Sequence, residues 1–324
     1  MFPRETIQKN LHNCLDDTSF LGLPDRKKGK VRDTYDLGDS LMLVTTDRQS
    51  AFDRILASIP FKGAVLNLVS GFWFENTRHI VANQVISIPD PNVTIAKKCA
   101  VFPIEFVIRG YLTGSTDTAA WTQYAKGVRN LCGNVLPDGM VKNQKFSRPI
   151  ITPTTKAEDH DESISAGEIV SRGIIEESTW NKLSRIVFDL FAYGTETAAK
   201  NGLILVDTKY ELGTDSQGNI LLIDEVHTPD SSRYWIKETY ESRLAAGQEP
   251  ENIDKEFLRL WFREHCDPYK DAVLPKAPDD LVVELSSRYI RLFEMITGKA
   301  FEIQEQVPIK DRLAANLKRI GVIA

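Results

Sequence analysis

The sequence predicts a protein of about two domains that contains both α-helices and antiparallel β-hairpins. Its 324 residues correspond to two domains at roughly 150 residues each. One hairpin is predicted near the start of the chain and another in the middle, whereas the last third has the apolar spacing of helices. A chain of this length can bury a large core without disulfides or structural metals.

The first hairpin is predicted to follow a polar arm, residues 1–28. Residues 29–37 alternate between apolar and polar side chains, and a turn separates them from a second strand over residues 41–46. Residues 64–82 have apolar side chains at helical spacing and predict a helix. Residues 99–109 predict a buried strand interrupted at Pro103.

We place the domain boundary close to this proline. The expected domains are an N-terminal antiparallel-sheet lobe, residues 1–105, and a C-terminal lobe with further helices, residues 106–324.

The middle of the chain predicts two helices and a hairpin. Ser165 and Glu168 have the spacing of a capping box, which starts a short helix. A longer helix that ends near Gly202 is expected to bury Trp180, Leu183, Val187, Leu190 and Phe191. The hairpin joins residues 203–212 to residues 220–225, and helices over residues 254–265, 279–297 and 308–319 follow as structural cover.

Composition narrows the class of protein. The formal net charge of −5, from 40 basic and 45 acidic residues, argues against nucleic acid as the main partner. The four cysteines have the spacing of neither a zinc site nor a disulfide framework, and reduced cysteines are typical of the cytoplasm. No window approaches the roughly 20 apolar residues of a membrane span, and no apolar leader begins the chain. We therefore expect a cytoplasmic protein without membrane contact.

The hairpin over residues 203–225 carries several charged side chains. Asp207, Lys209 and Glu211 share one face because side chains alternate along a strand. A turn centred between residues 217 and 218 would place Glu211 opposite Asp224. Two adjacent carboxylates require a cation or a shared proton, and Mg²⁺ often uses one or two carboxylates together with substrate phosphates. The alternative is a solvated polar face, which the apolar neighbours on both strands disfavour.

The loop directly after this hairpin is a candidate anion site. Pro229-Asp230-Ser231 is typical of a turn, and backbone N–H groups, hydroxyls and Arg233 could bind a phosphate or carboxylate. The alternative is an ordinary turn with a surface arginine. Arg109 and Ser115 lie in a second stretch of this kind at the exit of a strand, which lacks the ending of a Walker A loop.

Two further loops contain candidate residues. Residues 152–162 include Lys156 and His160 among four acidic residues. They form either a solvated loop or a lid over an amino-acid substrate, and the single histidine disfavours the third alternative, a metal site. Residues 46–53 follow a strand and contain Ser50 and Asp53. The alternative for this second loop, which also contains Asp47 and Arg48, is a turn with an internal Asp–Arg pair.

Taken in order, these motifs resemble the SAICAR synthetase family of purine biosynthesis, in its longer, fungal-type form. The matching segments extend from Gly29-Lys-Val-Arg-Asp33 to Asp224–Trp235. Between them lie Thr46–Asp53, Val107–Ser115, Thr152–Glu158 and Asp207–Gly213.

The resemblance implies an α+β fold of two lobes, with an ATP site in the cleft between them that is related to those of protein kinases and ATP-grasp enzymes. It also implies a reaction in which ATP, the carboxylated aminoimidazole ribonucleotide CAIR and L-aspartate give SAICAR, ADP and phosphate through an acyl phosphate. ATP and Mg²⁺ are the implied cofactors. The expected assembly is a monomer or a small homo-oligomer.

Residue roles are implied by the same resemblance. ATP would contact Gly29, Lys30, Arg32 and, at its adenine, Val101. The metal ligands would be Glu211 and Asp224. Residues at the reacting groups would be Lys209, Asp230 and Arg233. The substrates would contact Ser50, Asp53, Arg109, Ser115, Lys156, His160 and Ser231.

Two other classes of protein share parts of this pattern. A small-molecule kinase would have the same metal hairpin and phosphate pocket but would not need aspartate. A non-catalytic nucleotide-binding protein would have no need for the Glu211 and Asp224 pair, which disfavours it.

Overall fold

A computed structural model describes residues 2–116, 118–156, 162–253, 256–303 and 306–323. The chain divides into two compact units. The first consists of Met1–Trp73, Gln84–Lys98 and Ile253–Ala324, and the second of Phe74–Asn83 and Cys99–Asn252. This division differs from the boundary predicted at residues 105 and 106, because the C-terminal helices belong to the first unit.

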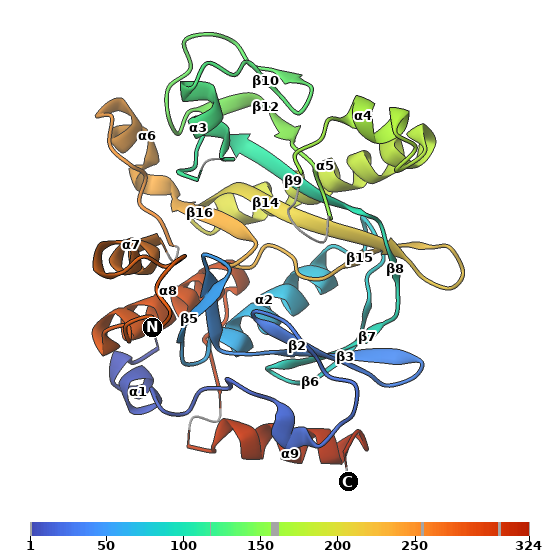
Figure 1. Cartoon of the computed structure of the whole chain (residues 1–324), viewed down its shortest axis with the longest axis vertical. Helices are drawn as coiled ribbons and strands as arrows, with labels where there is room; N and C mark the ends of the chain where they lie inside the picture. The colour runs from blue at the N-terminus through green and yellow to red at the C-terminus, as the bar shows by residue number, and fades with distance from the viewer. Residues whose placement is uncertain (1, 117, 157–161, 254–255, 304–305, 324) are drawn as a thin grey trace. The chain divides into compact units, whose positions relative to one another are not determined.

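The first unit is built on an antiparallel five-stranded sheet with the order β1-β2-β3-β7-β6 (Figure 1). Its strands are β1 (Lys27–Lys28), β2 (Arg32–Asp36), β3 (Ser40–Thr45), β6 (Val85–Asp90) and β7 (Val93–Lys97). The hairpin of β4 (Arg48–Ala51) and β5 (Arg54–Ser58) follows β3 and leads into helix α2 (Lys62–Asn76). The predicted hairpin of residues 29–46 is confirmed by the pairing of β2 with β3.

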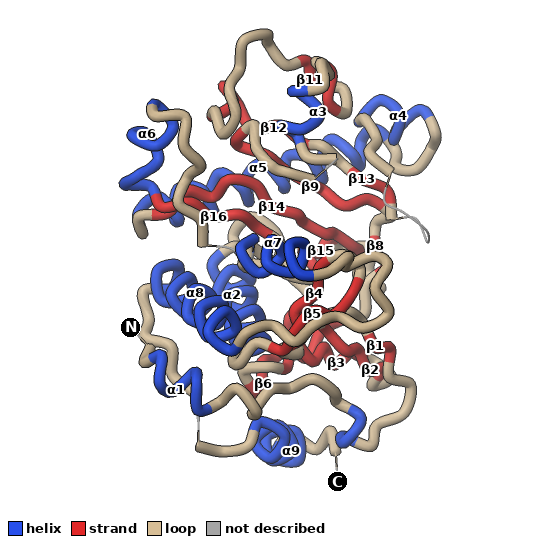
Figure 2. The backbone as a smooth tube through the Cα atoms, turned by 60° about the vertical axis from the view of Figure 1, so that its left-hand side comes forward, coloured by secondary structure: helices blue, strands red, loops and turns tan. Residues whose placement is uncertain are grey.

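Terminal segments complete the core of this unit. The helices are α1 (Arg4–Lys9), η1 (Ser19–Leu21), α7 (Glu256–His265), α8 (Asp279–Thr297) and α9 (Ile309–Arg319). Helix α9 buries Leu313 and Leu317 against Tyr35 and Met42 of the sheet, and Figure 2 shows it alongside β6. The arm over residues 1–28 is therefore more than a polar lead-in, since it forms α1 and buries Ile7, Leu15 and Leu21.

The second unit contains a larger sheet with the order β12-β9-β14-β15, to which β8, β13 and β16 also pair. The strands are β8 (Ala100–Val101), β9 (Ile104–Tyr111), β12 (Lys145–Ile151), β13 (Thr154–Thr155), β14 (Leu203–Thr214), β15 (Ile220–Ile223) and β16 (Ser232–Ile236). The smaller elements are α3 (Ala120–Ala125), β10 (Asn130–Leu131), β11 (Asn134–Val135), α4 (Ala166–Ser171) and α6 (Lys237–Ala245). Helix α5 (Glu177–Lys200) runs along β14 (Figure 1).

Most predicted elements of the second unit are confirmed. Pro103 separates β8 from β9. Ser165 and Glu168 form both hydrogen bonds of the capping box. Helix α5 buries all five predicted apolar side chains, and Gly202 follows it with a φ of 75°. The mixture of helices and antiparallel sheets confirms the α+β class.

Helix α2 ends earlier than predicted, at Asn76 instead of residue 82. The side-chain amide of Asn83 donates to the carbonyl of Phe74 over 2.8 Å and so uses an acceptor of the last helical turn. The apolar spacing continues past this point, which is why the sequence predicts a longer helix.

In the part of the chain that the structure describes, no helix is both long and apolar enough to span a membrane. The four cysteines are all free, as expected from their spacing.

Candidate active site

Charged side chains lie along one face of the sheet formed by β9 and β14. Register pairs Asp207 with Arg109 and Lys209 with Val107, so strand alternation places Glu105 and Arg109 on the same face as Asp207, Lys209 and Glu211. The other face of β14 carries side chains such as Tyr210 and Leu212, which are fully buried. A single strand therefore presents a polar site on one side and supports the core on the other.

Lys209 is the centre of a carboxylate cluster, defined as Glu105, Glu211 and Asp224. Its Nζ lies 2.9 Å from Glu105 Oε1, 2.8 Å from Glu211 Oε1 and 3.9 Å from Asp224 Oδ2. Burial alone would lower the pKa of Lys209, but the three carboxylates outweigh it and raise this pKa above its usual value. The lysine is therefore a permanent cation.

Lys156 forms a second ion pair in this cluster, with the other oxygen of Glu211. Three carboxylates and two ammonium groups leave a formal charge of −1. The cluster can therefore accept further positive charge.

The register of the hairpin differs from the prediction. Glu211 pairs with Ile223, and the turn covers five residues, 215–219, so Asp224 is not the cross-strand partner of Glu211. The turn is centred on Gln217, because the N–H of Asp215 donates to the carbonyl of Asn219 over 3.1 Å and the Asp215 carboxylate accepts from the N–H groups of Gln217 and Asn219. Asp224 instead leaves the strand with a left-handed φ of 64°, and its carboxylate still reaches Lys209.

Two arginines converge on Asp207. Arg233 binds it in a bidentate manner, with Nε 3.0 Å from Oδ1 and Nη2 on Oδ2. Arg109 Nη1 lies 3.5 Å from Oδ2, while its Nε donates to Thr152 Oγ1 over 2.8 Å. Burial lowers the pKa of Arg109 from its usual value, and Asp207 opposes this shift. Two cations on one carboxylate leave a net positive charge, which suits an anionic ligand.

Gly114 allows the chain to pass close to this arginine pair. Its φ is 108°, and a Cβ at this position would lie 3.0 Å from Arg233 Nη1 and 2.5 Å from the Cβ of Ala119. The next residue, Ser115, is exposed. The Arg109–Ser115 stretch therefore lies against Arg233 at Gly114, and the role of Ser115 toward a substrate stays a prediction.

The loop over residues 228–232 is held by its own hydroxyls. Thr228 Oγ1 accepts from the N–H groups of Asp230 over 3.3 Å and Ser231 over 3.1 Å, and donates to Glu225. Ser231 Oγ in turn accepts from the N–H of Thr228 over 3.1 Å. These hydrogen bonds fix the loop, and the roles of Asp230 and Ser231 toward a ligand stay predictions.

His227 is a polar residue whose side chain is fully buried. It has a φ of 50°, its Nε2 bonds with the hydroxyl of Tyr210, and its carbonyl accepts from Tyr234 over 2.8 Å. A Cβ on Gly194 of helix α5 would lie 2.2 Å from His227 Cε1, so the absent side chain provides the space for the ring. Burial lowers the pKa of His227 to about 3, which keeps the ring neutral.

The first unit contains the remaining candidates. The N–H of Gly29 donates to the carbonyl of Arg32 over 2.9 Å, and a Cβ on Gly29 would lie 2.5 Å from that oxygen, so only glycine fits this turn. Lys30 Nζ pairs with Asp53 Oδ1 over 2.5 Å, and both side chains are exposed. The structure thus joins a predicted ATP residue to a predicted substrate residue.

Other predicted residues are placed as follows. Arg32 begins β2, Ser50 lies in β4 and is partly exposed, and Val101 is 48% exposed on β8. His160 lies outside the described residues. Within the described ranges no group of three or more His, Cys, Asp and Glu side chains has the geometry of a metal site. Arg48 forms its ion pair with Asp33, outside residues 46–53, and this differs from the alternative of a turn with an internal Asp–Arg pair.

Sequence reasoning missed Glu105 and the partner of Arg48. Glu105 could have been found as an acidic residue in an otherwise apolar strand, two positions from Val107 and four from Arg109. The ion pair of Arg48 and Asp33 joins β4 to β2, and nothing in the sequence next to either residue indicates it.

A sheet face with clustered carboxylates and lysines, continued by an arginine pair, is a site for an enzyme that acts on phosphorylated, anionic substrates. A model of the SAICAR synthetase family matches residues 25–276. The chain belongs to this family, as the motifs of the sequence predict.

Relatives and solved structures agree with this assignment. The phosphoribosylaminoimidazole-succinocarboxamide synthase of Legionella pneumophila (strain Paris) is 60% identical over 94% of this chain and 98% of its own. The chloroplastic enzyme of that name from Arabidopsis thaliana is 61% identical over 96% of this chain and 77% of its own. The structure described as SAICAR-synthase from Saccharomyces cerevisiae complexed with SAICAR has a TM-score of 0.77 and 31% identity, and covers 89% of this chain and 100% of its own.

The buried His227 predicts a pH dependence of stability. In the unfolded chain this imidazole takes up a proton below a pKa of about 6.5, whereas the folded protein holds its pKa at about 3. The unfolded state therefore binds more protons between these values, and stability falls as the pH drops. From pH 6.5 to 5.0 we expect a loss of roughly 1.6 kcal/mol from this group, measured by urea unfolding.

The variant His227→Leu should lose this share of the pH dependence, although the unpaired Tyr210 hydroxyl lowers its stability at both pH values. His265→Leu, at an exposed histidine, is the control and should keep the wild-type slope. Equal slopes for His227→Leu and the wild type would disprove the role of His227.

Proposed function

We propose that this chain is the ATP-dependent ligase that joins CAIR to L-aspartate and gives SAICAR, ADP and phosphate. The observation that supports it most directly is the polar face of β14. On this one strand, Lys209 and Glu211 belong to a cation-accepting cluster, and Asp207 two residues away holds an arginine pair. A phosphoryl-transfer site next to an anion pocket is what this reaction requires.

Glu211 and Asp224 fit the requirements of a Mg²⁺ site. The carboxylate cluster has a formal charge of −1 even with both lysines present, and Mg²⁺ is commonly bound by one or two carboxylates plus phosphate oxygens. When bound, Mg²⁺ supplies neutralisation of phosphate charge during transfer. Lys209 orients the carboxylates, since it contacts both Glu211 and Asp224.

The arginine pair is assigned to the ribonucleotide. Arg109 and Arg233 bind its anionic groups, with Ser115 and Ser231 as neighbouring hydroxyls and Asp230 at the reacting groups. Asp207 fixes the guanidinium plane of Arg233 through two hydrogen bonds, so that its outer N–H groups are preoriented.

The remaining assignments concern ATP and aspartate. Gly29, Lys30 and Arg32 contact the ATP phosphates, and Val101 contacts adenine. Ser50 and Asp53 contact substrate in the first unit. Lys156, which is paired with Glu211, and His160, which is outside the described residues, contact the second substrate.

The proposed chemistry has two steps. A carboxylate oxygen of CAIR attacks the γ-phosphorus of ATP, and ADP leaves to give an acyl phosphate. The amine of aspartate then attacks the acyl carbon, phosphate leaves, and the nitrogen loses a proton. Lys209 and, if held by Glu211 and Asp224, a Mg²⁺ ion would stabilise the negative charge that develops on the phosphoryl group in the first step.

We further propose a cytoplasmic location and a monomer or small homo-oligomer, with no nucleic acid or membrane as partner. The acidic net charge supports the absence of a nucleic-acid partner.

A three-substrate assay tests the ligase against the small-molecule kinase. ADP release should require ATP, CAIR and aspartate together, because the acyl phosphate is productive only when an amine captures it. Omitting each substrate in turn should reduce sustained ADP release to the background rate. A kinase would release ADP at the full rate without aspartate, and this outcome would exclude the ligase.

Asp224→Asn should reduce kcat at least about 100-fold, since it removes one charged Mg²⁺ ligand. Asparagine tolerates the left-handed φ of this position, so the fold should be retained. The control is Asp138→Asn, which changes a carboxylate of the same unit whose side chain is 89% exposed. Comparable rates for Asp224→Asn and the wild type at saturating Mg²⁺ would remove Asp224 from the metal site.

Arg233→Ala should raise the KM for CAIR by about 10- to 100-fold and leave the KM for ATP within about twofold. It removes the bidentate partner of Asp207 and half of the arginine pair. Arg148→Ala, at an exposed arginine of β12, is the matched control. Equal increases of both KM values in Arg233→Ala would contradict the assignment to the ribonucleotide.

A further inference from the structure

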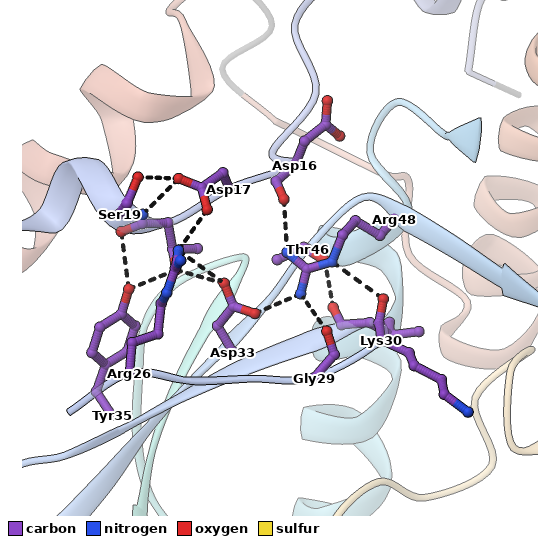
Figure 3. Close-up of polar contacts among 12 residues, drawn as sticks. Asp16, Asp17, Ser19, Arg26, Gly29, Lys30, Asp33, Tyr35, Thr46 and Arg48 are labelled. Carbon is purple, nitrogen blue, oxygen red and sulfur yellow. Dashed lines mark hydrogen bonds and ion pairs between the residues drawn. The ribbon is translucent and has the colours of Figure 1, made fainter. Parts of the chain in front are cut away.

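Arg48 is a buried cation that binds the back of the glycine loop, defined here as residues 29–31. Arg48 is the first residue of β4, and its side chain is 2% exposed. Figure 3 shows the guanidinium at the centre of four hydrogen bonds. Nη2 lies 2.9 Å from the carbonyl of Gly29 and 2.5 Å from Asp33 Oδ1, Nε lies 3.2 Å from the carbonyl of Lys30, and Nη1 lies 2.7 Å from the carbonyl of Asp16.

These contacts determine which way the peptide groups of the loop point. The carbonyls of Gly29 and Lys30 both accept from one planar guanidinium, so they face the same side. In a trans peptide the N–H of the following residue points opposite to the carbonyl. The N–H groups of Lys30 and Val31 therefore both point away from Arg48.

Thr46 extends the same arrangement by one residue. Its N–H and its hydroxyl both donate to the carbonyl of Val31, over 2.9 Å and 2.5 Å. Three successive carbonyls of this segment thus accept hydrogen bonds, two from Arg48 and one from Thr46. Successive N–H groups that face one side form a concave site for an anion such as a phosphate. The Lys30 side chain leads away from Arg48 in Figure 3 and adds an ammonium group to the loop.

The Arg48 charge is balanced and its orientation is fixed by groups far away in the sequence. Asp33 is fully buried and also accepts from Thr18 Oγ1 over 2.7 Å. The Asp16 carbonyl and Thr18 both come from the N-terminal arm, so the arm supports the loop through Arg48. A lysine could not replace these contacts, because its ammonium is a single point of charge and not a planar fork.

We propose that Arg48 is a positioning residue that orients the backbone of the glycine loop for binding the phosphates of the nucleotide. It contacts no substrate itself and acts through the carbonyls of Gly29 and Lys30. The inference rests on the proposed function only in that the glycine loop binds nucleotide.

The test compares Arg48→Lys with Arg312→Lys. Arg312 is a matched control because it is also a buried arginine of the first unit, 7% exposed, and forms a bidentate ion pair with Asp90 over 3.1 and 3.2 Å. Its partners, Asp90 and Asn92, lie outside the glycine loop. Both variants keep the charge, so both should lose a similar amount of thermal stability.

Binding of Mg·ADP is measured by calorimetry without CAIR or aspartate. The KM values for ATP, CAIR and aspartate are then measured in a steady-state assay. Arg48→Lys should raise the Kd for Mg·ADP and the KM for ATP about tenfold, and leave the KM values for CAIR and aspartate within about twofold. Arg312→Lys should leave all of these values within about twofold. Equal nucleotide affinities for the two variants would overturn the proposal.

A second variant covers the case in which Arg48→Lys does not fold. Asp33→Asn with Arg48→Met removes both charges together and so leaves no unpaired buried charge. It still lacks the donors to the two carbonyls, and it should show the same loss of Mg·ADP affinity. Wild-type affinity in this double variant would also overturn the proposal.

The outcome separates this inference from the proposed function. A wild-type protein that binds Mg·ADP but releases no ADP with CAIR and aspartate would refute the ligase, while the comparison of Arg48→Lys and Arg312→Lys would still decide the role of Arg48. A wild-type protein without affinity for Mg·ADP would refute the glycine loop as a nucleotide site, and the proposal for Arg48 with it.

Discussion

A charged side chain that leaves water must keep a partner, and this requirement organises the polar clusters within each unit of the protein. An unpaired buried charge costs several kcal/mol, whereas a well-bonded pair can be tolerated. Arg48 meets the requirement with Asp33 and three carbonyls. Lys209 meets it with the carboxylate cluster, and the two arginines with Asp207. Each set of partners holds a functional group in one orientation.

The same pairing explains why the site is ready for its ligands. A guanidinium that already uses two N–H groups on Asp207 loses less conformational freedom when its remaining N–H groups bind an anion. The lysines also hold the carboxylate oxygens of the cluster close together, so that fewer side-chain conformations are lost when a cation binds. The conformational entropy of these side chains is lost when the protein folds, so it does not have to be lost again when the substrates bind.

The sequence predicts the parts of the site that depend on local rules. Strand alternation correctly places Asp207, Lys209 and Glu211 on one face, and the capping box and α5 follow from their spacing. The register of the β14–β15 hairpin cannot be predicted in this way. A change of one residue in the length of the turn shifts every cross-strand pair, and the local sequence is compatible with more than one turn length. Likewise, nothing near Arg48 indicates Asp33, since their contact depends on how two strands and the N-terminal arm meet.

The membership of the C-terminal helices in the first unit has the same origin. The apolar faces of α8 and α9 are clear from their periodicity, but the pattern does not specify which sheet covers them. Leu313 and Leu317 pack against Tyr35 and Met42, which lie more than 270 residues earlier in the chain. The motifs of the family lie between residues 29 and 235, so their resemblance could not supply this information either.

The contact between Gly194 and His227 has a consequence for how the family can vary. A methyl group on residue 194 would overlap the imidazole ring, with the two carbons 2.2 Å apart. The ring in turn bonds with Tyr210 and sits three residues after Asp224, in the segment that leaves β15. A residue larger than glycine at position 194 therefore requires a side chain smaller than histidine at position 227. The two positions are expected to change together.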